Sequence, residues 1–159
     1  KINNHGGSIK IYIKKNNKVK IEKSVKELLK EEEKFGIKKY QTYKDFAKKV
    51  YKIRDNVRKN ISKLTKNNNK IIGYGSPAKA TTALNFFGIS NEIECIIEDN
   101  KLKQGKFLPG MKIPIISKKE LNGKPDYLLI LAWNFFEEIK ENNKSIAKNF
   151  LSIKNLEKE

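Results

Sequence analysis

In the stretch Lys70-Ile-Ile-Gly-Tyr-Gly-Ser-Pro-Ala-Lys79, a short apolar run leads into two glycines and then into a run typical of a helix. Isoleucine favours a buried strand, and glycine allows the backbone to turn with a positive φ. The residue types also predict a helix over 78–87. Ser76 is a suitable N-cap, Pro77 is suited to the first helical position, and Gly88 is suited to the C′ position that follows the helix. The stretch therefore predicts a strand, a tight turn and a helix. Such a turn presents backbone N–H groups and the positive end of a helix dipole to one point, as a phosphate requires.

The pattern of the turn is Gly-x-Gly-x-x-Ala, which is close to the dinucleotide-binding fingerprint. An isolated match of this kind is weak, because a tight strand-to-helix turn without a ligand has the same glycines. Both interpretations therefore stay open until the rest of the sequence is considered.

Strands and helices alternate after this turn. Apolar runs predict strands at 92–97, 113–116, 125–132 and 150–153, with a helical turn at 118–121 and a helix for which Asn134 is the N-cap. The run at 125–132 is almost continuously apolar, as is typical of a parallel strand covered on both faces. The alternation predicts an α/β fold, a Rossmann-like domain of three layers with a mostly parallel sheet.

The ligand crevice of such a sheet lies beyond the carboxyl ends of the strands, where the strand order changes direction. If the strand before the glycine turn is the neighbour of strand 125–132, the turn faces Trp133-Asn134. Glu98-Asp99 ends a strand about twenty residues beyond the turn, where dinucleotide folds place the carboxylate that holds a ribose. Lys79 is in the first turn of the helix and could neutralise a phosphate, while Ser76 and the backbone donate hydrogen bonds.

Two helices are predicted ahead of the α/β core, within residues 24–66. Ser24-Val-Lys-Glu27 is a capping-box pattern for the first helix, which we expect to end near Gly36. The second is long, begins at Thr42 and ends at Asn67. One apolar stripe at spacings of three and four runs along it, and we expect it to pack on the sheet or to bridge to another part of the protein: Phe46, Val50, Ile53, Val57, Ile61 and Leu64.

At the start of the chain, Ile9, Ile11 and Ile13 alternate with polar residues or tyrosine, which predicts a half-buried strand. Because no neighbouring segment could pair with it, we interpret 1–15 as the terminal strand of a missing upstream domain plus linker. Residues 16–159 then form the Rossmann-like domain, with a helical lead-in at 24–66 and an α/β core at 70–153. We interpret His5 as a loop histidine.

The composition limits the classes of partner. The formal net charge of +17 suggests nucleic acid, but Arg54 and Arg58 are the only arginines and no recognition motif accompanies the dispersed lysines. We therefore predict no nucleic-acid partner. Cys95, the single cysteine, is predicted to be a buried thiol, and one Cys with one His cannot form a disulfide or a zinc site. Without a signal peptide or a bilayer-spanning apolar run, the chain is predicted to be cytoplasmic, with no membrane partner.

Five motifs, taken in order and at their spacing, resemble those of a known family: His5-Gly-Gly-Ser-Ile-Lys-Ile-Tyr12, Gly73-Tyr-Gly-Ser-Pro-Ala-Lys79, Glu98-Asp-Asn100, Lys103-Gln-Gly-Lys-Phe-Leu-Pro-Gly110 and Leu131-Ala-Trp-Asn134. Nearly the whole chain is similar to the C-terminal domain of the SAM-dependent sugar C-methyltransferases, which act on nucleotide-linked deoxysugars. Lys10 stands where that family often has arginine.

The resemblance implies an enzyme of three parts: a zinc-binding N-terminal domain, a central methyltransferase domain and a Rossmann-like C-terminal domain that helps hold the sugar nucleotide. In the family a base removes a proton beside a keto group and the enolate attacks the methyl group of SAM. The residues for zinc, SAM and proton removal lie upstream. This fragment is therefore expected to have no catalytic residue, metal or cofactor and to be inactive alone, while SAM and a structural zinc are expected in the full-length enzyme.

The partners that the resemblance implies are a nucleotide-sugar small molecule and the upstream methyltransferase domain of the same chain. The candidate substrate-binding residues, which would line the cleft and hold the nucleotide diphosphate, are Gly73, Tyr74, Gly75, Ser76, Lys79, Asp99, Trp133 and Asn134. Two alternatives stay open. One is an NAD- or CoA-type nucleotide-binding module, which the Gly-x-Gly turn and the acidic strand end favour, and the other is a structural or interaction domain whose turn has no ligand.

Overall fold

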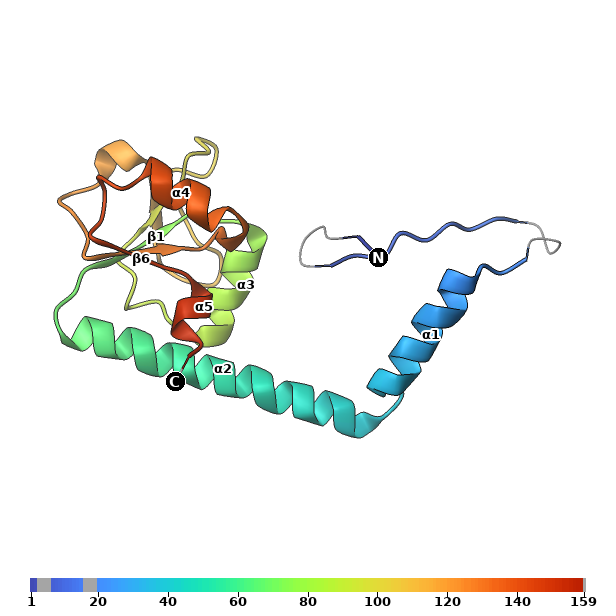
Figure 1. Ribbon diagram of the computed structural model, residues 1–159. Helices are drawn as coiled ribbons and strands as arrows, with labels where there is room; N and C mark the ends of the chain where they lie inside the picture. Colours follow the sequence, from blue (N-terminus) through green and yellow to red (C-terminus); the bar gives the residue numbers. More distant parts are fainter. Residues whose placement is uncertain (3–6, 16–19, 159) are drawn as a thin grey trace. The chain divides into compact units, whose positions relative to one another are not determined.

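The computed structural model describes residues 1–2, 7–15 and 20–158, and the chain divides into two compact units, Lys1–Lys49 and Val50–Glu159 (Figure 1). His5 and residues 16–19 lie outside the described residues. The second unit contains the sheet and the candidate site. The predicted boundary after residue 15 stays a prediction.

In the first unit, helix α1 (Lys23–Phe35) ends at Gly36, whose φ of 86° is left-handed, as expected for a C-terminal glycine. The predicted capping box is wrong, because the N-cap is Glu22 and makes no side-chain cap. Ser24 already lies inside the helix, and its hydroxyl donates to the Glu22 carboxylate at 3.5 Å. Helix α2 (Tyr40–Lys66) begins in the first unit and continues into the second. It begins ahead of Thr42, whose hydroxyl instead donates to the carbonyl of Gly36 at 2.8 Å.

The strand predicted at residues 9–13 is wrong. Among the described residues of this segment no strand forms, and the nearest pairing is a single bridge between Ile2 and Ser8. Ile9, Ile11 and Ile13 are 52%, 71% and 92% exposed. A strand needs a neighbour for its backbone N–H and C=O groups, and alternation of side chains alone does not supply one.

The second unit is built on a six-stranded sheet with the order β3-β4-β2-β1-β5-β6. Every pair in the sheet is parallel except β3 with β4. This confirms the predicted α/β fold with a mostly parallel sheet. The strands are β1 (Ile71–Tyr74), β2 (Ile96–Ile97), β3 (Lys106–Phe107), β4 (Pro114–Ile116), β5 (Tyr127–Ile130) and β6 (Asn149–Leu151).

The four strands whose bounds were predicted are all shorter in the structure, and one strand, β3, was not predicted. The run at 92–97 forms a strand only at Ile96–Ile97. The last strand stops at Leu151 because Ser152 begins the short helix α5 (Ile153–Leu156) with a capping box that includes Asn155. The stretch 101–110, in which no strand was predicted, contains β3, which adds an antiparallel edge to the sheet.

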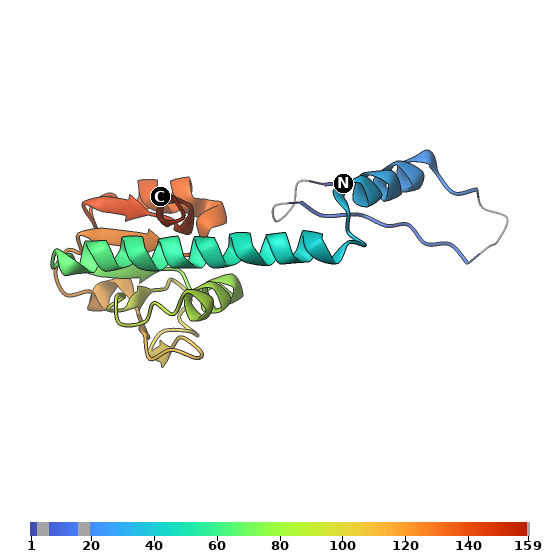
Figure 2. The ribbon, with the colours of Figure 1, turned by 90° about the horizontal axis from the view of Figure 1, so that it is seen from below.

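Helices cover both faces of the sheet (Figures 1 and 2). The first face packs against α2, α3 (Ala78–Phe87) and α5, and its core includes Val57, Ile61, Leu84, Leu129 and Leu156. The second face packs near α4 (Phe136–Asn142) around Ile72, Tyr74, Cys95, Leu128 and Ile146, so Cys95 is buried as predicted. Burial raises the pKa of the Cys95 thiol. Of the stripe predicted along α2, only Val57 and Ile61 are fully buried, and Phe46 is 65% exposed.

Side chains of α2 hold the ends of two other helices. The Asn56 amide donates to the carbonyl of Glu157 at 2.9 Å, and the Asn60 amide donates to the carbonyls of Leu156 and Lys158 at 3.0 and 2.7 Å. Arg58 donates to the carbonyl of Phe87, next to the left-handed Gly88 that ends α3 as predicted. These bonds supply partners for carbonyls that a helix end leaves free.

No helix in the described ranges combines the length and the apolar character needed to cross a membrane.

Candidate functional site

The glycine turn lies where the strand order changes direction. From β1 the chain continues to β2 and β4 on one side, and then crosses to β5 and β6 on the other. The strand before the turn and strand β5 are therefore neighbours, with Gly73 opposite Leu129 in register, which meets the condition stated for the predicted cleft. This is the place where open α/β sheets form their ligand crevice.

The two glycines of the turn serve packing and backbone geometry. A Cβ on Gly73 would lie 2.9 Å from Ile96 Cγ1 and 3.1 Å from Leu131 Cδ1, so the core fills the space beside it. Gly75 has a φ of 81° and donates its N–H to the carbonyl of Ile97 at 2.8 Å. Only glycine adopts that φ without strain. Both positions thus need glycine whether or not a ligand binds.

Ser76 does not cap α3, and the predicted N-cap is wrong. The N-cap is Pro77, in an extended conformation and without a side-chain cap. The Ser76 hydroxyl is instead engaged with Glu98 from the end of β2, which it contacts at 2.5 Å. The physical reason is the orientation of the side chain: the charge-assisted bond directs the Ser76 hydroxyl toward Glu98, whereas a capping serine directs its oxygen toward an N–H of the helix.

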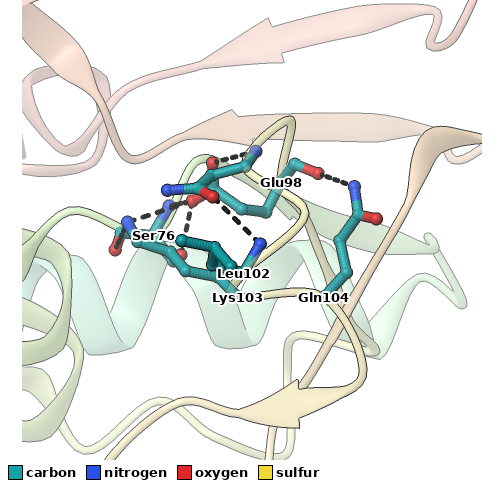
Figure 3. A network of polar contacts seen from close by, with 6 residues as sticks. Ser76, Glu98, Leu102, Lys103 and Gln104 are labelled. Carbon is teal, nitrogen blue, oxygen red and sulfur yellow. Dashed lines mark hydrogen bonds and ion pairs between the residues drawn. The ribbon is translucent and has the colours of Figure 1, made fainter.

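Glu98 is the centre of a polar network at the turn, shown in Figure 3. Its Oε2 accepts the backbone N–H of Ser76 at 2.9 Å as well as the hydroxyl, and its Oε1 accepts the N–H of Asn100 at 3.1 Å. Lys103 Nζ donates to the carbonyl of Ser76 at 2.9 Å and lies 3.4 Å from Glu98 Oε2. The side chain of Gln104 donates to the Glu98 carbonyl at 2.7 Å. The network joins the turn after β1 to the loop that follows β2.

The charged form of Glu98 is favoured in this position. Its side chain is only 12% exposed, and burial by itself raises the pKa of a carboxyl group. Hydrogen bonds from Ser76 and Asn100, together with the ammonium of Lys103, outweigh that effect and hold the pKa of Glu98 below its usual value. The glycine turn therefore already faces an anion, which the protein itself supplies.

Tyr74 and Asp99 form a second polar contact, on the opposite face of the sheet from α3. The Tyr74 hydroxyl donates to Asp99 Oδ2 at 2.8 Å, and the ring packs in the core on the α4 side. Burial, followed by the hydrogen bond and the negative charge of Asp99, raises the pKa of Tyr74 to about 12. Asp99, predicted to line the cleft, is thus brought to Tyr74.

The Tyr74 hydroxyl should contribute to stability most at pH values below its unfolded-state pKa of about 10. The folded protein binds this proton more tightly than the unfolded chain, so stability falls as the pH rises from about 10 towards about 12. We expect Tyr74→Phe to lower the free energy of unfolding by about 1 kcal/mol at pH 8, and by less at pH 11.5. Urea denaturation of both proteins at the two pH values measures this difference. An equal loss at both pH values would contradict the assignment.

A shallow depression, wide open to solvent, lies along α3, and we refer to it as the α3 groove. It is lined by Ala78, Lys79, Thr82, Ala83, Phe86 and Trp133. Its volume is about 470 Å³. Lys79 Nζ stands over the ring of Trp133, 4.9 Å from the ring centroid, which is cation–π geometry. The groove therefore combines one positive charge with aromatic and small side chains.

The structure brings only two of the eight predicted residues, Lys79 and Trp133, into the α3 groove. Asn134 is exposed, and its predicted role as N-cap is wrong: it lies in the short 3-10 helix η3 (Trp133–Phe135), and Phe135 precedes α4. The spacing of three and four residues along α3 could have identified Thr82 and Phe86, since they share a face with Lys79. The roles of Lys103 and Gln104 had no such signal, because both depend on how the loop after β2 folds.

A six-stranded, mostly parallel sheet with helices on both faces and a glycine turn at its switch point defines a Rossmann-like α/β domain. The model of the C-methyltransferase C-terminal domain family matches residues 3–151, and the chain belongs to that family. A relative, the C-methyltransferase NovU of Streptomyces niveus, is 36% identical over 148 residues, which are 91% of this chain and 35% of NovU. The chain thus spans about a third of the length of this relative.

Proposed function

We propose that this chain is the substrate-binding C-terminal domain of a SAM-dependent C-methyltransferase that acts on a nucleotide-linked deoxysugar. The observation that carries the proposal is membership of the C-methyltransferase C-terminal domain family across residues 3–151. The position of the α3 groove beside the sheet's switch point supports it. In such an enzyme this domain contributes orientation of the substrate, which lowers the entropic part of the barrier.

The α3 groove offers chemistry suited to part of a nucleotide sugar. The ammonium of Lys79 can pair with a diphosphate oxygen, and it now rests on the face of Trp133. Once the ammonium moves to the phosphate, the indole face can stack against a base or the apolar face of a deoxysugar. The donors of Ser76, by contrast, are engaged with Glu98, so Lys79 is the positive group of the groove that is placed to meet the diphosphate.

The family resemblance implies SAM and a structural zinc for the full-length enzyme. In the described part of the chain, no group of three or more His, Cys, Asp or Glu side chains could hold a metal ion. The N–H of Ser76, at the glycine turn, is bonded to a carboxylate. We assign SAM and zinc to other parts of a longer enzyme, and no chemical step is placed on this chain.

The NAD- or CoA-type alternative is less well supported by the site. A dinucleotide fold needs a carboxylate free to hold the ribose. Glu98 is bonded to Ser76, and Asp99 accepts the hydroxyl of Tyr74.

Trp133 is the only tryptophan, so its fluorescence reports on the α3 groove without labelling. We expect dTDP and a dTDP-linked keto-sugar to change the emission of Trp133 in a saturable way, while NAD and SAM leave it unchanged. Lys79→Ala should weaken binding of dTDP by about tenfold, because a charge-assisted hydrogen bond to phosphate is lost. Titration calorimetry on the same proteins gives the affinities.

Lys124→Ala is the matched control, because Lys124 is exposed and is absent from the lining of the groove. It removes the same charge and should bind dTDP as the unchanged chain does. Equal losses in both variants would mean that overall charge, not the groove, attracts the nucleotide. Binding of NAD in preference to dTDP would support the dinucleotide alternative, and no binding by any of the four compounds would argue against a ligand site on this chain.

A further inference from the structure

The donors of the glycine turn bind a carboxylate of the protein itself, that of Glu98. In a phosphate-binding turn, the first N–H groups beyond the glycines and a nearby hydroxyl donate to phosphate oxygens. Here the N–H and the hydroxyl of Ser76 both donate to one oxygen of Glu98, at 2.9 and 2.5 Å. A carboxylate from the next strand therefore occupies the position that a phosphate oxygen would take.

We propose that Glu98 determines the ligand specificity of this domain by closing the glycine turn to the pyrophosphate of dinucleotides. A phosphate at the turn would have to displace the carboxylate from Ser76 or share the position with it. Displacement breaks two charge-assisted hydrogen bonds, and sharing places two negative charges within a few ångströms of one another. Either outcome disfavours a phosphate at this point.

The loop after β2 keeps the carboxylate in place. Lys103 joins the Ser76 carbonyl to the Glu98 carboxylate, and Gln104 holds the Glu98 backbone (Figure 3). The second carboxylate oxygen accepts the N–H of Asn100, so both oxygens have partners. Glu98 is thus fixed from its side chain and its backbone, and it is not a mobile surface carboxylate.

The same contacts indicate what the turn becomes without the carboxylate. In Glu98→Ala, the N–H and hydroxyl of Ser76 and the ammonium of Lys103 lose their shared acceptor and remain close together. Three donors around one vacated position form a site for a phosphate oxygen. The exclusion of phosphate from the turn then depends on the side chain of Glu98. Removing this side chain should allow pyrophosphate to bind at the turn. A purely structural role for Glu98 does not predict such a gain.

The experiment measures binding of inorganic pyrophosphate, and of NAD, by nuclear magnetic resonance of the backbone amides. In the unchanged chain, we expect the Ser76 amide signal not to shift on addition of pyrophosphate. In Glu98→Ala, the Ser76 signal should shift in a saturable way, with affinity increased by at least about tenfold because a like charge has been removed. Glu98→Gln keeps the size of the side chain and should show a smaller gain, which separates the effect of charge from that of space.

Glu94→Gln is the matched control for net charge. Glu94 is exposed and pairs with Lys70 at 3.0 Å, outside the network, so this variant should gain nothing. A saturable shift of Ser76 in the unchanged chain would overturn the proposal. So would the lack of a gain in Glu98→Gln with its native amide spectrum intact, even if Glu98→Ala failed to fold. The outcome is independent of dTDP binding reported by Trp133, so failure here and failure of the proposed function are distinguishable.

Discussion

Replacing Ile61 by alanine is expected to lower the free energy of unfolding of the α/β unit by about 2–5 kcal/mol. Ile61 is fully buried in the core that α2, α3 and α5 form with one face of the sheet. The loss combines the transfer free energy of the removed methyl and methylene groups with the cavity that they leave. Because domains of this size are stable by only about 5–15 kcal/mol, the change is a large fraction of the total. Denaturation by urea, followed by circular dichroism, measures it.

Phe46→Ala is the control for this experiment, because it removes an apolar side chain of the same helix that is exposed. Phe46 belongs to the same stripe of apolar residues along α2, but its side chain is 65% exposed. It should therefore change the free energy of unfolding by less than about 0.5 kcal/mol. A loss at Phe46 equal to that at Ile61 would mean that the whole stripe is buried in solution.

The second large effect is expected for Gly73→Ala, which should destabilise the α/β unit by about 1–3 kcal/mol through overpacking. The new methyl group would meet Ile96 Cγ1 at 2.9 Å and Leu131 Cδ1 at 3.1 Å. Gly73 lies in the middle strand, paired on one side with β2 and on the other with β5, so the backbone has little room to move. Thermal and chemical denaturation both measure the loss.

Gly123→Ala separates crowding from backbone strain. Gly123 has a φ of 70°, and no atom lies within 4 Å of the place that a Cβ would take, so its replacement should cost about 1 kcal/mol from the left-handed conformation alone. The φ of Gly73 is outside the left-handed region, and its loss must come from side-chain contacts. A native-like stability for Gly73→Ala would contradict the packing of β1 against its neighbours.

The sequence predicted the place of β1 and β5 well, but it missed β3 and was wrong about the start of the chain. Around β1 and β5, apolar runs, glycines and the turn all favour the same structure, so local and tertiary preferences agree. Strand β3 is two residues long, and its antiparallel pairing with β4 depends on a loop that has no periodic pattern. The isoleucines at 9–13 have the period of a strand, but that period supplies no partner strand, and no described residue pairs with them.

The candidate site was predicted in part for a similar reason. The neighbourhood of β1 and β5 followed from topology, which brought Lys79 and Trp133 together. The role of Ser76 did not follow, because helix capping is a local preference and Glu98 is a distant competitor that arrives from another strand. Asn134 illustrates the same limit, since a 3-10 turn moved the start of α4 beyond the position that its capping pattern indicated.

The hydrogen bonds that side-chain amides of α2 donate to carbonyls after β6 affect how the protein folds during its synthesis. Asn60 and Leu156 are 96 residues apart in sequence, and β1 is completed by β5 only after the chain has passed through β2 and β4. Contacts between such distant residues raise the contact order, and folding becomes slower. On the ribosome, β1 therefore emerges long before its central neighbour, and its open edge is the part of the nascent chain most in need of protection from aggregation.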